Sequence, residues 1–480
     1  MPDGRYWLQT LGCPKNQVDS DKLEGVLRAE GYEPARAPGQ ADLVVVNTCA
    51  FIEAAREESI ETILELARLR RRHARLVVTG CMAERYGTEL AAALPEVDLV
   101  AGFGQSIVPS VAHVRSSDGP PAPPAPPAPP PPAPVELGPR RGRGGRRRTR
   151  HHPPAGVASF DLLALPRPPS AAPWAYVKVA EGCDRRCGFC AIPSFRGLQC
   201  SRAAPDVLQE VRALVSDASM PVQEIVLVAQ DLASYGVDRS APGRAVAGAR
   251  RHRPGPLVSL VREVAAVAAR TRLLYLYPSG LTDELVEAVL GTGVPYFDLS
   301  LQHVSRPLLA RMRRWGEGER FLARIARIRA QAPDATFRSS FIVGYPGETE
   351  EDHCALVDFL GAAELDWAGF FAYSREAGTH ADGLDGQVPA GLVAERLAEC
   401  AERQDAITAR RRDALVGLVR RVLVDAPGEA RTVHEAPEID GVVKVPRELP
   451  VGALVDVRLT AALGPDLVGE PVADRSGAPA

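Results

Sequence analysis

Three cysteines within a run of eight residues constrain this chain more than any other feature. Cys183, Cys187 and Cys190 follow a predicted buried strand from Trp174 to Val179, in the spacing C-x3-C-x2-C. This spacing can hold three irons of a cubane iron–sulfur cluster and leave the fourth iron open to a substrate or cosubstrate. A closed cluster or zinc site would take a fourth thiolate or imidazole nearby, and residues 191–199 contain neither. The spacing alone also allows unlinked thiols or a partial zinc site.

Residues 1–115 alternate between strand-like and helix-like segments, which predicts an N-terminal parallel α/β domain. Short apolar runs predict strands, and apolar residues at helical spacing predict the helices between them. The predicted strands are Tyr6 to Thr10, Leu43 to Asn47 and Leu76 to Thr79, and the predicted helices are Val18 to Arg28 and Ala54 to Leu69.

A second set of cysteines follows these strands. Cys13, Cys49 and Cys81 are separated by gaps of 36 and 32 residues, yet each one comes directly after a predicted strand. Because the carboxyl ends of parallel strands border the same crevice, the topology predicts that the three thiols converge. Cysteine is also among the most buried residue types, so three unconnected core cysteines are the alternative.

Residues 169–406 repeat the strand and helix alternation on a larger scale, which predicts a partial (β/α)6 barrel that is open on one side. The predicted strands after Trp174 to Val179 are Ile225 to Ala229, Leu273 to Tyr277, Tyr296 to Leu301, Phe337 to Val343 and Gly369 to Tyr373. The predicted helices are Leu257 to Ala269, Asp283 to Leu290, Glu319 to Ala330, Glu350 to Leu360 and Leu392 to about Leu418.

Residues 408–474 are predicted to end the chain in a small antiparallel β-barrel, because short strands alternate there with glycine and proline. From Arg420 to Asp474 there are six Lys and Arg against ten Asp and Glu, a net charge of 6 − 10 = −4. Such a surface opposes binding to a phosphate backbone and attracts a basic protein.

Residues 116–168 are predicted to be a disordered linker. Eleven of the fifteen residues 120–134 are proline, and seven of the eleven residues 140–150 are arginine. A contact with ribosomal RNA or with an acidic partner through the arginines is the alternative. A second surface insertion is predicted over residues 239–256, which are rich in arginine and glycine.

Composition limits the class of protein. The 57 Lys and Arg against 60 Asp and Glu give no overall attraction to nucleic acid. Nine cysteines are too few for a disulfide scaffold in 480 residues and fit reduced, metal-binding thiols. The sequence has no apolar run of signal-peptide type and none of about 18 residues that could cross a membrane, so we expect a soluble cytoplasmic protein.

Four segments of the chain resemble the methylthiotransferase branch of the radical S-adenosylmethionine superfamily. The resemblance implies a 4Fe-4S cluster on Cys183, Cys187 and Cys190 that cleaves S-adenosylmethionine. It also implies an auxiliary 4Fe-4S cluster on Cys13, Cys49 and Cys81, whose open iron can hold sulfide or methylsulfide, and a second S-adenosylmethionine that supplies the methyl group. It further implies an electron donor such as flavodoxin or ferredoxin and a C-terminal TRAM domain. The matching segments are Leu11 to Ser20, Val46 to Ile52, Ile192 to Gly197 and Ala436 to Gly441.

Weaker matches lie at the ends of predicted barrel strands. The segment Ser340 to Glu348, with Gly344 at its centre, resembles the family's cosubstrate-binding segment, and an ordinary strand-to-helix turn is the alternative. His303 and the pair Gln230 and Asp231 also follow predicted strands. No catalytic residue beyond the clusters is predicted, and Cys200, Cys354 and Cys400 are interpreted as ordinary thiols.

The residues after the first cysteine indicate the substrate. Pro14, Lys15 and Asn16 follow Cys13, whereas the transfer-RNA branch of the family usually has Gln-Met-Asn there. The resemblance therefore implies methylthiolation of the β-carbon of an aspartate in small-subunit ribosomal protein twelve, on or near the ribosome. Methylthiolation of transfer-RNA adenosine is one alternative. A ribosome- or RNA-binding factor stabilised by iron–sulfur clusters is an alternative of another class.

Overall fold

We describe the chain from a computed structural model. The structure describes residues 4–103, 167–239 and 255–472, together with residues 105, 107, 163 and 165. The proline and arginine runs of the predicted linker, and most of the predicted insertion at 239–256, lie outside the described residues.

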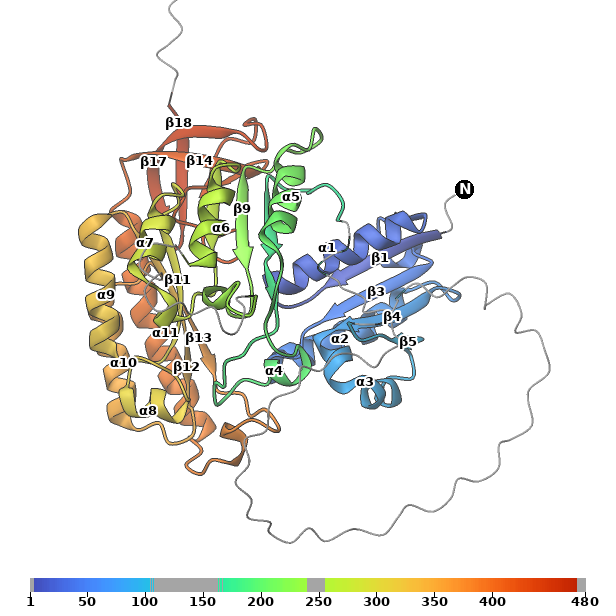
Figure 1. Cartoon of the computed structure of the whole chain (residues 1–480), viewed down its shortest axis with the longest axis horizontal. Coiled ribbons are helices and arrows are strands. Elements are labelled where there is room, and N and C mark those ends of the chain that lie inside the picture. The colour runs from blue at the N-terminus through green and yellow to red at the C-terminus, as the bar shows by residue number, and fades with distance from the viewer. Residues whose placement is uncertain are drawn as a thin grey trace, which may run out of the picture.

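The N-terminal domain is a five-stranded parallel sheet in the order β2-β1-β3-β4-β5. Helix α1 packs on one face of the sheet, and α2 and α3 pack on the other (Figure 1). The three predicted strands and two predicted helices are all present, with ends that differ by a few residues. The elements are β1 Gly4–Thr10, α1 Pro14–Ala29, β2 Tyr32–Pro34, β3 Leu43–Thr48, α2 Glu53–Leu69, β4 Arg75–Gly80, α3 Cys81–Ala93 and β5 Leu99–Val100.

The central domain is a partial barrel of six parallel strands. Two three-stranded sheets, β6-β9-β10 and β11-β12-β13, are joined where Leu276 bridges to Leu299. The strands are β6 Trp174–Lys178, β9 Glu224–Val228, β10 Arg270–Leu273, β11 Tyr296–Gln302, β12 Thr336–Val343 and β13 Trp367–Ala372. The helices are α4 Ile192–Phe195, α5 Ala204–Val215, α6 Pro256–Ala265, α7 Asp283–Leu290, α8 Arg306–Arg311, α9 Gly318–Gln331, α10 Glu350–Ala363 and α11 Ala390–Asp413. A short antiparallel pair, β7 Ala180–Glu181 with β8 Cys200–Ser201, flanks the first cysteine set.

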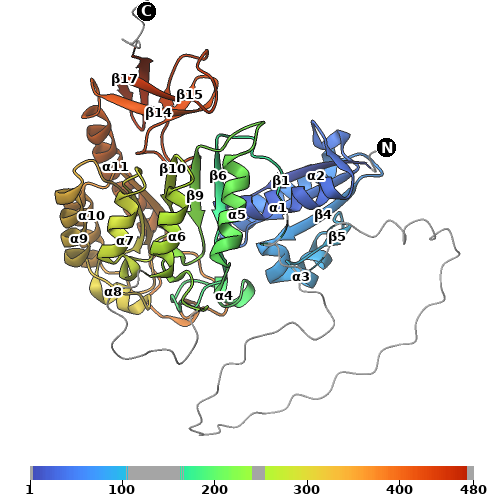
Figure 2. The same cartoon turned by 45° about the horizontal axis from the view of Figure 1, so that its top comes forward.

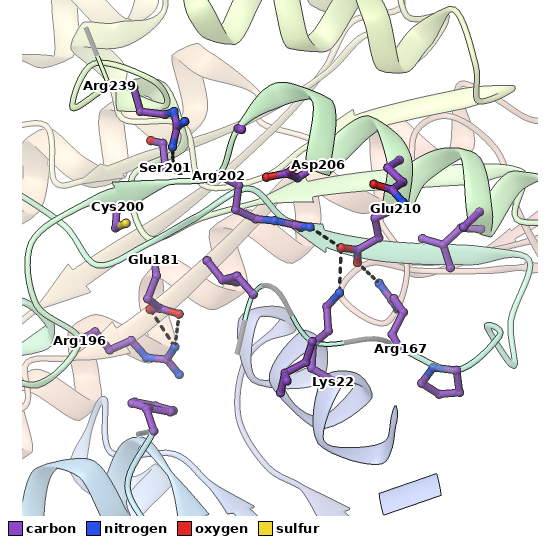
Figure 3. A pocket seen from close by; sticks show the side chains of 18 of the residues that line it. Lys22, Arg167, Glu181, Arg196, Cys200, Ser201, Arg202, Asp206, Glu210 and Arg239 are labelled. Atoms are coloured by element: carbon purple, nitrogen blue, oxygen red, sulfur yellow. Dashed lines mark hydrogen bonds and ion pairs between the residues drawn. The ribbon is translucent and has the colours of Figure 1, made fainter. Parts of the chain in front are cut away.

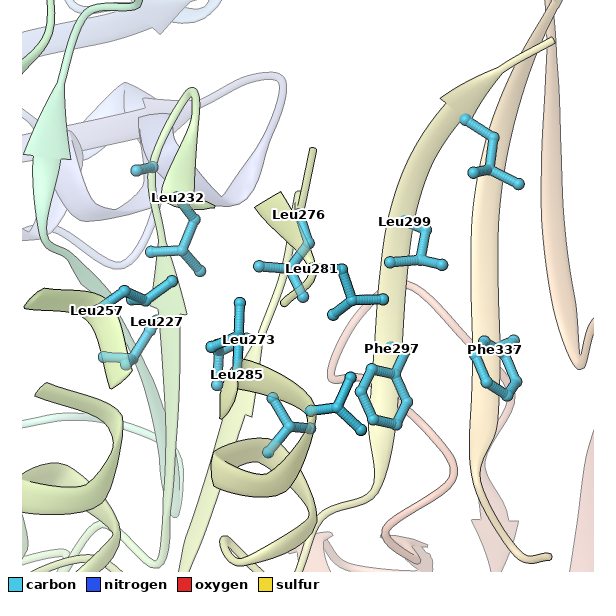
Figure 4. Close-up of a cluster of buried hydrophobic side chains, with 14 of the residues drawn as sticks. Leu227, Leu232, Leu257, Leu273, Leu276, Leu281, Leu285, Phe297, Leu299 and Phe337 are labelled. Carbon is cyan, nitrogen blue, oxygen red and sulfur yellow. The ribbon is translucent and has the colours of Figure 1, made fainter. Parts of the chain in front are cut away.

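A layer of aliphatic and aromatic side chains between the strands and the outer helices holds the barrel together. Leu227, Leu273 and Phe297 from three strands meet Leu257 and Leu285 from α6 and α7 (Figure 4). These side chains are at most 4% exposed, so their burial supplies much of the free energy that keeps the strand ends in place.

The third barrel strand differs from its prediction. Apolar character placed this strand at Leu273 to Tyr277, but β10 is the charged segment Arg270–Leu273. Both arginines of β10 are buried because they have acceptors. Arg270 donates to the carbonyl of Arg431 in the C-terminal domain at 3.1 Å. Arg272 donates to the carboxylate of Glu224 in β9 at 2.6 Å and to the carbonyl of Val433 in the C-terminal domain at 3.2 Å.

The C-terminal domain is a closed antiparallel barrel with one parallel pair, in the order β14-β15-β16-β18-β17, which confirms the predicted small barrel. Its segment 431–440 packs against the amino-terminal ends of the central strands, so the two barrels meet there (Figure 2). Tyr176 and Tyr296 donate to the carbonyl of Pro437 at 2.9 Å and to the carboxylate of Asp440 at 2.6 Å. The strands are β14 Val419–Ala426, β15 Glu429–Arg431, β16 Val443–Lys444, β17 Leu454–Leu463 and β18 Asp466–Pro471.

Ion pairs join the N-terminal domain to the central barrel. Lys22 on α1 contacts Glu210 on α5 at 2.8 Å, and Arg167 contacts both Glu210 and Asp21. At the other end of the contact, Arg85 of α3 lies 2.6 Å from Glu376. These paired charges fix the sheet of one domain beside β6 of the other.

The described helices include none that is long and apolar enough to span a membrane.

Candidate metal centre at the domain contact

The first cysteine set lies in the loop that leaves the carboxyl end of the first barrel strand. The thiols of Cys183 and Cys187 accept hydrogen bonds from the backbone N–H of Arg185 at 3.4 Å and from the Arg314 guanidinium at 3.2 Å. The backbone of Gly182 has a φ of +73°, and a Cβ there would lie 2.3 Å from the carbonyl oxygen of Leu198, so only glycine fits.

Thiols of this loop influence one another electrostatically. Burial, together with the neighbouring thiols of Cys187 and Cys183, raises the pKa of Cys190 to about 12. Burial likewise raises the pKa of Cys183 to about 11. Since a metal ligates the thiolate, binding would have to drive deprotonation of these groups.

The second cysteine set converges at the carboxyl edge of the N-terminal sheet. Cys13 follows β1, Cys49 follows β3, and Cys81 is the first residue of α3, directly after β4. A Cβ at Gly12 would lie 3.0 Å from the Cys49 sulfur, which shows how closely the first two turns approach. The charge of Cys13 also acts on the pKa values of both Cys49 and Cys81.

The three thiols of the second set have different electrostatic surroundings. Burial raises the pKa of Cys49 to about 12 and raises that of Cys81. Burial acts in the same direction on Cys13, but the charges of Lys15 and Arg196 and two backbone N–H groups outweigh it, so the pKa of Cys13 is lowered. A thiolate therefore forms most readily at Cys13.

Arg196 connects the two sets. Its guanidinium donates to the Cys81 sulfur, to the carboxylate of Asp19 at 3.1 Å and to that of Glu181 at 2.9 Å. Lys178 on β6 contacts the same two carboxylates. Two cations and two carboxylates thus balance in a buried network between Cys81 and the loop that begins at Cys183.

The donor sets suit iron–sulfur clusters. None of the nine cysteines, all of which lie in described segments, forms a disulfide. Among the described residues no three His, Cys, Asp or Glu side chains are close enough to hold a single metal ion. Each thiolate of a cubane cluster binds a different iron, so such a ligand set is spaced more widely, and N–H···S hydrogen bonds like those above are typical of cluster thiolates.

The weaker sequence matches also follow carboxyl ends of strands. The N–H of Gly344 donates to the carboxylate of Glu348 at 2.6 Å, within the turn after β12. His303 is buried, which lowers its pKa to about 4 and keeps it neutral. Gln230 donates to Glu181 at 2.7 Å, and Asp231 pairs with Arg185 at 2.6 Å, so both residues support the cysteine loop.

A cavity of about 1100 Å³ lies beside this network (Figure 3). The Glu181 and Arg196 pair borders it on one side, and Lys22 and Glu210 border it on another. Of the nine cysteines, only Cys200 lines this cavity.

Sequence reasoning singled out the cysteines but missed the charged residues between them. Asp19 and Arg196 lie within segments that resemble the family, and Glu181 lies two residues before Cys183. A charged residue inside a predicted buried strand or helix, such as Lys178 in β6, would have indicated these buried ion pairs.

Comparison with known proteins places all three domains in families. Residues 5–102 match the uncharacterized protein family UPF0004, residues 177–360 match the radical SAM superfamily, and residues 416–472 match the TRAM domain. Among solved structures, the radical S-adenosylmethionine methyltransferase TsrM from Kitasatospora setae aligns over 93% of this chain and 81% of that chain, with a TM-score of 0.46 and 15% identity.

Curated relatives match over nearly the whole chain. The ribosomal protein uS12 methylthiotransferase RimO of Nocardioides sp. is 40% identical over 96% of both chains. The RimO proteins of Saccharopolyspora erythraea and Moorella thermoacetica are 42% and 40% identical, over 98% and 94% of this chain and 95% of each relative. This chain therefore belongs to the RimO family of radical S-adenosylmethionine methylthiotransferases.

Proposed function

We propose that this chain attaches a methylthio group to the β-carbon of an aspartate in ribosomal protein uS12. The relatives named above carry uS12 in their names, which favours this substrate over transfer RNA. The net charge of −4 in the C-terminal barrel, counted from Arg420 to Asp474, also favours a basic protein partner, because opposite charges attract.

Family membership implies S-adenosylmethionine and iron–sulfur cofactors. Our proposal assigns one 4Fe-4S cluster to Cys183, Cys187 and Cys190, and an auxiliary 4Fe-4S cluster to Cys13, Cys49 and Cys81. When bound, the first cluster would pass the electron for reductive cleavage of S-adenosylmethionine and the auxiliary cluster would hold the sulfur that is transferred, while a second S-adenosylmethionine would supply the methyl group. We keep Gly344 as a candidate for the S-adenosylmethionine region, and flavodoxin or ferredoxin as candidate electron donors.

The observation that carries the proposal is the buried connection between the cysteine sets. Arg196 contacts Cys81 of one set and Glu181 beside the other, so the two domains hold both sets in a fixed relation. Replacing an unactivated C–H bond needs a radical and, separately, a source of sulfur. Two cysteine sites held together by the Arg196 network can deliver the radical and the sulfur to the same substrate carbon.

The domain division belongs to the proposal. We assign residues 1–115 to the auxiliary site, 169–406 to the radical core and 408–474 to the TRAM domain, with 116–168 as a linker. Shortening the linker would then leave the content of both clusters unchanged, as measured by iron and sulfide per chain.

Anaerobic reconstitution tests the cluster assignment. We expect about eight irons per chain for the unmodified protein and about four after Cys→Ala replacement of either whole set. Without Cys183, Cys187 and Cys190, reductive formation of 5′-deoxyadenosine should stop. Without Cys13, Cys49 and Cys81, it should continue while sulfur insertion stops. Sulfur insertion by the second variant would remove the auxiliary site from the mechanism.

Mass spectrometry of uS12 tests the substrate. The protein from cells that lack this gene should lose a methylthio group from one aspartate, and a plasmid copy should restore it. An unchanged modification level would overturn the substrate. An inert, cluster-stabilised ribosome-binding factor would instead form no 5′-deoxyadenosine under reducing conditions.

A further inference from the structure

Lys15 extends from the N-terminal domain toward the strands of the central barrel. It lies in the first turn of α1, two residues after Cys13. Its Nζ is 3.3 Å from the centre of the Tyr275 ring, in the segment that follows β10. Burial lowers the pKa of Lys15, and the charges of Cys13, Arg196, Asp298 of β11 and Lys178 of β6 also act on it. The ammonium group therefore faces the segment that follows β10 and interacts with residues of β6 and β11.

The charged neighbours of Lys15 in the central barrel already have partners. Arg196 and Lys178 share the carboxylates of Asp19 and Glu181. Asp298 accepts from the guanidinium of Arg338 at 3.2 Å and from the backbone N–H of Tyr275 at 2.9 Å.

Lys15 differs from these neighbours. Its ammonium makes no hydrogen bond or ion pair with any residue that the structure describes, and its close contact is the face of the Tyr275 ring. A cation–π contact stabilises the positive charge and leaves the N–H donors of the ammonium available.

We propose that the Lys15 ammonium binds the side-chain carboxylate of the substrate aspartate, an inference that rests on the function proposed above. Asp19, Glu181 and Asp298 lie nearby and would repel an incoming carboxylate. A carboxylate that leaves water also needs a hydrogen-bonded cation to offset its desolvation. Lys15 supplies such a cation, whereas the neighbouring cations Arg196 and Lys178 already donate to Asp19 and Glu181.

The position of Lys15 also orients the substrate. Cys13 is the N-cap residue of α1 and Lys15 lies in its first turn, so the cation and a sulfur ligand of the proposed auxiliary set are held close to each other. The β-carbon of aspartate is bonded directly to the carboxylate carbon. Holding the carboxylate at Lys15 therefore holds the reacting carbon beside the second cysteine set. The same contact discriminates aspartate from asparagine, which has no negative charge to pair.

A binding cycle tests this contact without turnover. Reconstituted holoenzyme with S-adenosylmethionine and no reductant is titrated with purified uS12, and with uS12 whose target aspartate is replaced by asparagine. We expect the unmodified enzyme to prefer aspartate by about 10- to 100-fold, the range for a charge-assisted hydrogen bond. Lys15→Met should bring this ratio close to one, and Lys15→Arg should restore part of it. An equal preference in the unmodified enzyme and in Lys15→Met would overturn the inference.

Turnover measurements separate this inference from the proposed function. Lys15→Met should keep the iron content and the substrate-independent formation of 5′-deoxyadenosine, while methylthiolation falls about 100-fold. Arg28→Met removes a half-exposed cation from the other end of α1. It should leave the iron content, the formation of 5′-deoxyadenosine and the methylthiolation rate unchanged. Methylthiolation by Lys15→Met at the unmodified rate would overturn the role of Lys15 alone. Absence of methylthiolation by the unmodified enzyme would overturn the proposed function itself.

Discussion

The guanidinium of Arg196 donates to the thiol sulfur of Cys81 from two nitrogens, through Nε at 3.3 Å and Nη2 at 3.0 Å. The two residues belong to different domains, so one side chain of the barrel completes the surroundings of a sulfur in the N-terminal sheet. Arginine suits this place because its planar group can serve the sulfur and two carboxylates at once.

We therefore expect Arg196→Lys to impair the auxiliary site selectively. Lysine keeps the charge but cannot reproduce the fork of donors to Cys81, Asp19 and Glu181. Iron should fall from about eight to about four per chain while reductive cleavage of S-adenosylmethionine persists. Arg202→Lys is the matched control, because Arg202 pairs with Glu210 at 2.7 Å and not with a thiol. Full iron content in Arg196→Lys would show that the contact is dispensable.

Two glycines beside the first cysteine set should respond differently to alanine. Gly182 and Gly197 have φ values of +73° and +77°, so each replacement carries a backbone cost of about 1–2 kcal/mol. An added Cβ meets nothing within 4 Å at Gly197, whereas at Gly182 it meets the carbonyl of Leu198. Gly182→Ala should therefore unfold at clearly lower temperature than Gly197→Ala and lose iron from this set. Thermal melts and iron analysis would check this, and equal melting temperatures would contradict it.

Asp440 should make stability depend on pH. Burial raises its pKa to about 6, although Arg338 and the hydroxyl of Tyr296 act in the opposite direction. Between the unfolded and folded pKa values the folded state binds more protons, so the free energy of unfolding falls as the pH rises through that window. From pH 5 to pH 7.5 this group should cost about 1 kcal/mol. Asp440→Asn should lack that part of the loss in denaturant titrations of the holoenzyme, and parallel curves for both proteins would count against the assignment.

Glu224 should anchor the TRAM domain. Its carboxylate lies 2.6 Å from Arg272 of β10 and 3.0 Å from Arg431 of β15, and all three side chains are at most 2% exposed. Glu224→Gln leaves two buried guanidinium groups short of a charge, at an expected cost of about 3–5 kcal/mol in unfolding free energy. Glu429→Gln breaks the exposed pair with Lys444 and should cost at most about 1 kcal/mol. Denaturant titration of both variants would check the contrast, and similar losses would contradict it.

Local patterns in the sequence predicted most of the fold. Continuous apolar runs located β3 and β4, which are buried on both faces of the sheet, and helical spacing located α2, which buries one face against its own domain. The same reasoning misplaced the strand at Arg270–Leu273, whose charged side chains are buried because Glu224 of β9 and carbonyl groups of the C-terminal domain provide acceptors. It also missed β15, a strand of three residues that is too short for a period to be visible.

The candidate site divides in the same way. Cys183, Cys187 and Cys190 are close in the chain, so their spacing predicts a shared site. The convergence of Cys13, Cys49 and Cys81 followed from parallel topology. The contact of Arg196 with Cys81 spans 115 residues and two domains, and no local periodicity encodes it. Lys15 is one of the residues after Cys13 that indicated a ribosomal-protein substrate. Its contact with Tyr275 could not be predicted, because it depends on how the two domains pack.

Phe103 and Arg167 lie on either side of the segment that links the first two domains, and both are held at the contact between these domains. Phe103 donates its N–H to Glu84 at 2.8 Å and lies under the Arg196 guanidinium, and Arg167 binds the carbonyl of Tyr176 and the carboxylate of Asp21. Covalent continuity is therefore not what holds the two halves in register. A pair of separately synthesised polypeptides, one ending after Phe103 and the other beginning shortly before Arg167, would carry every one of these contacts and could assemble into a split enzyme.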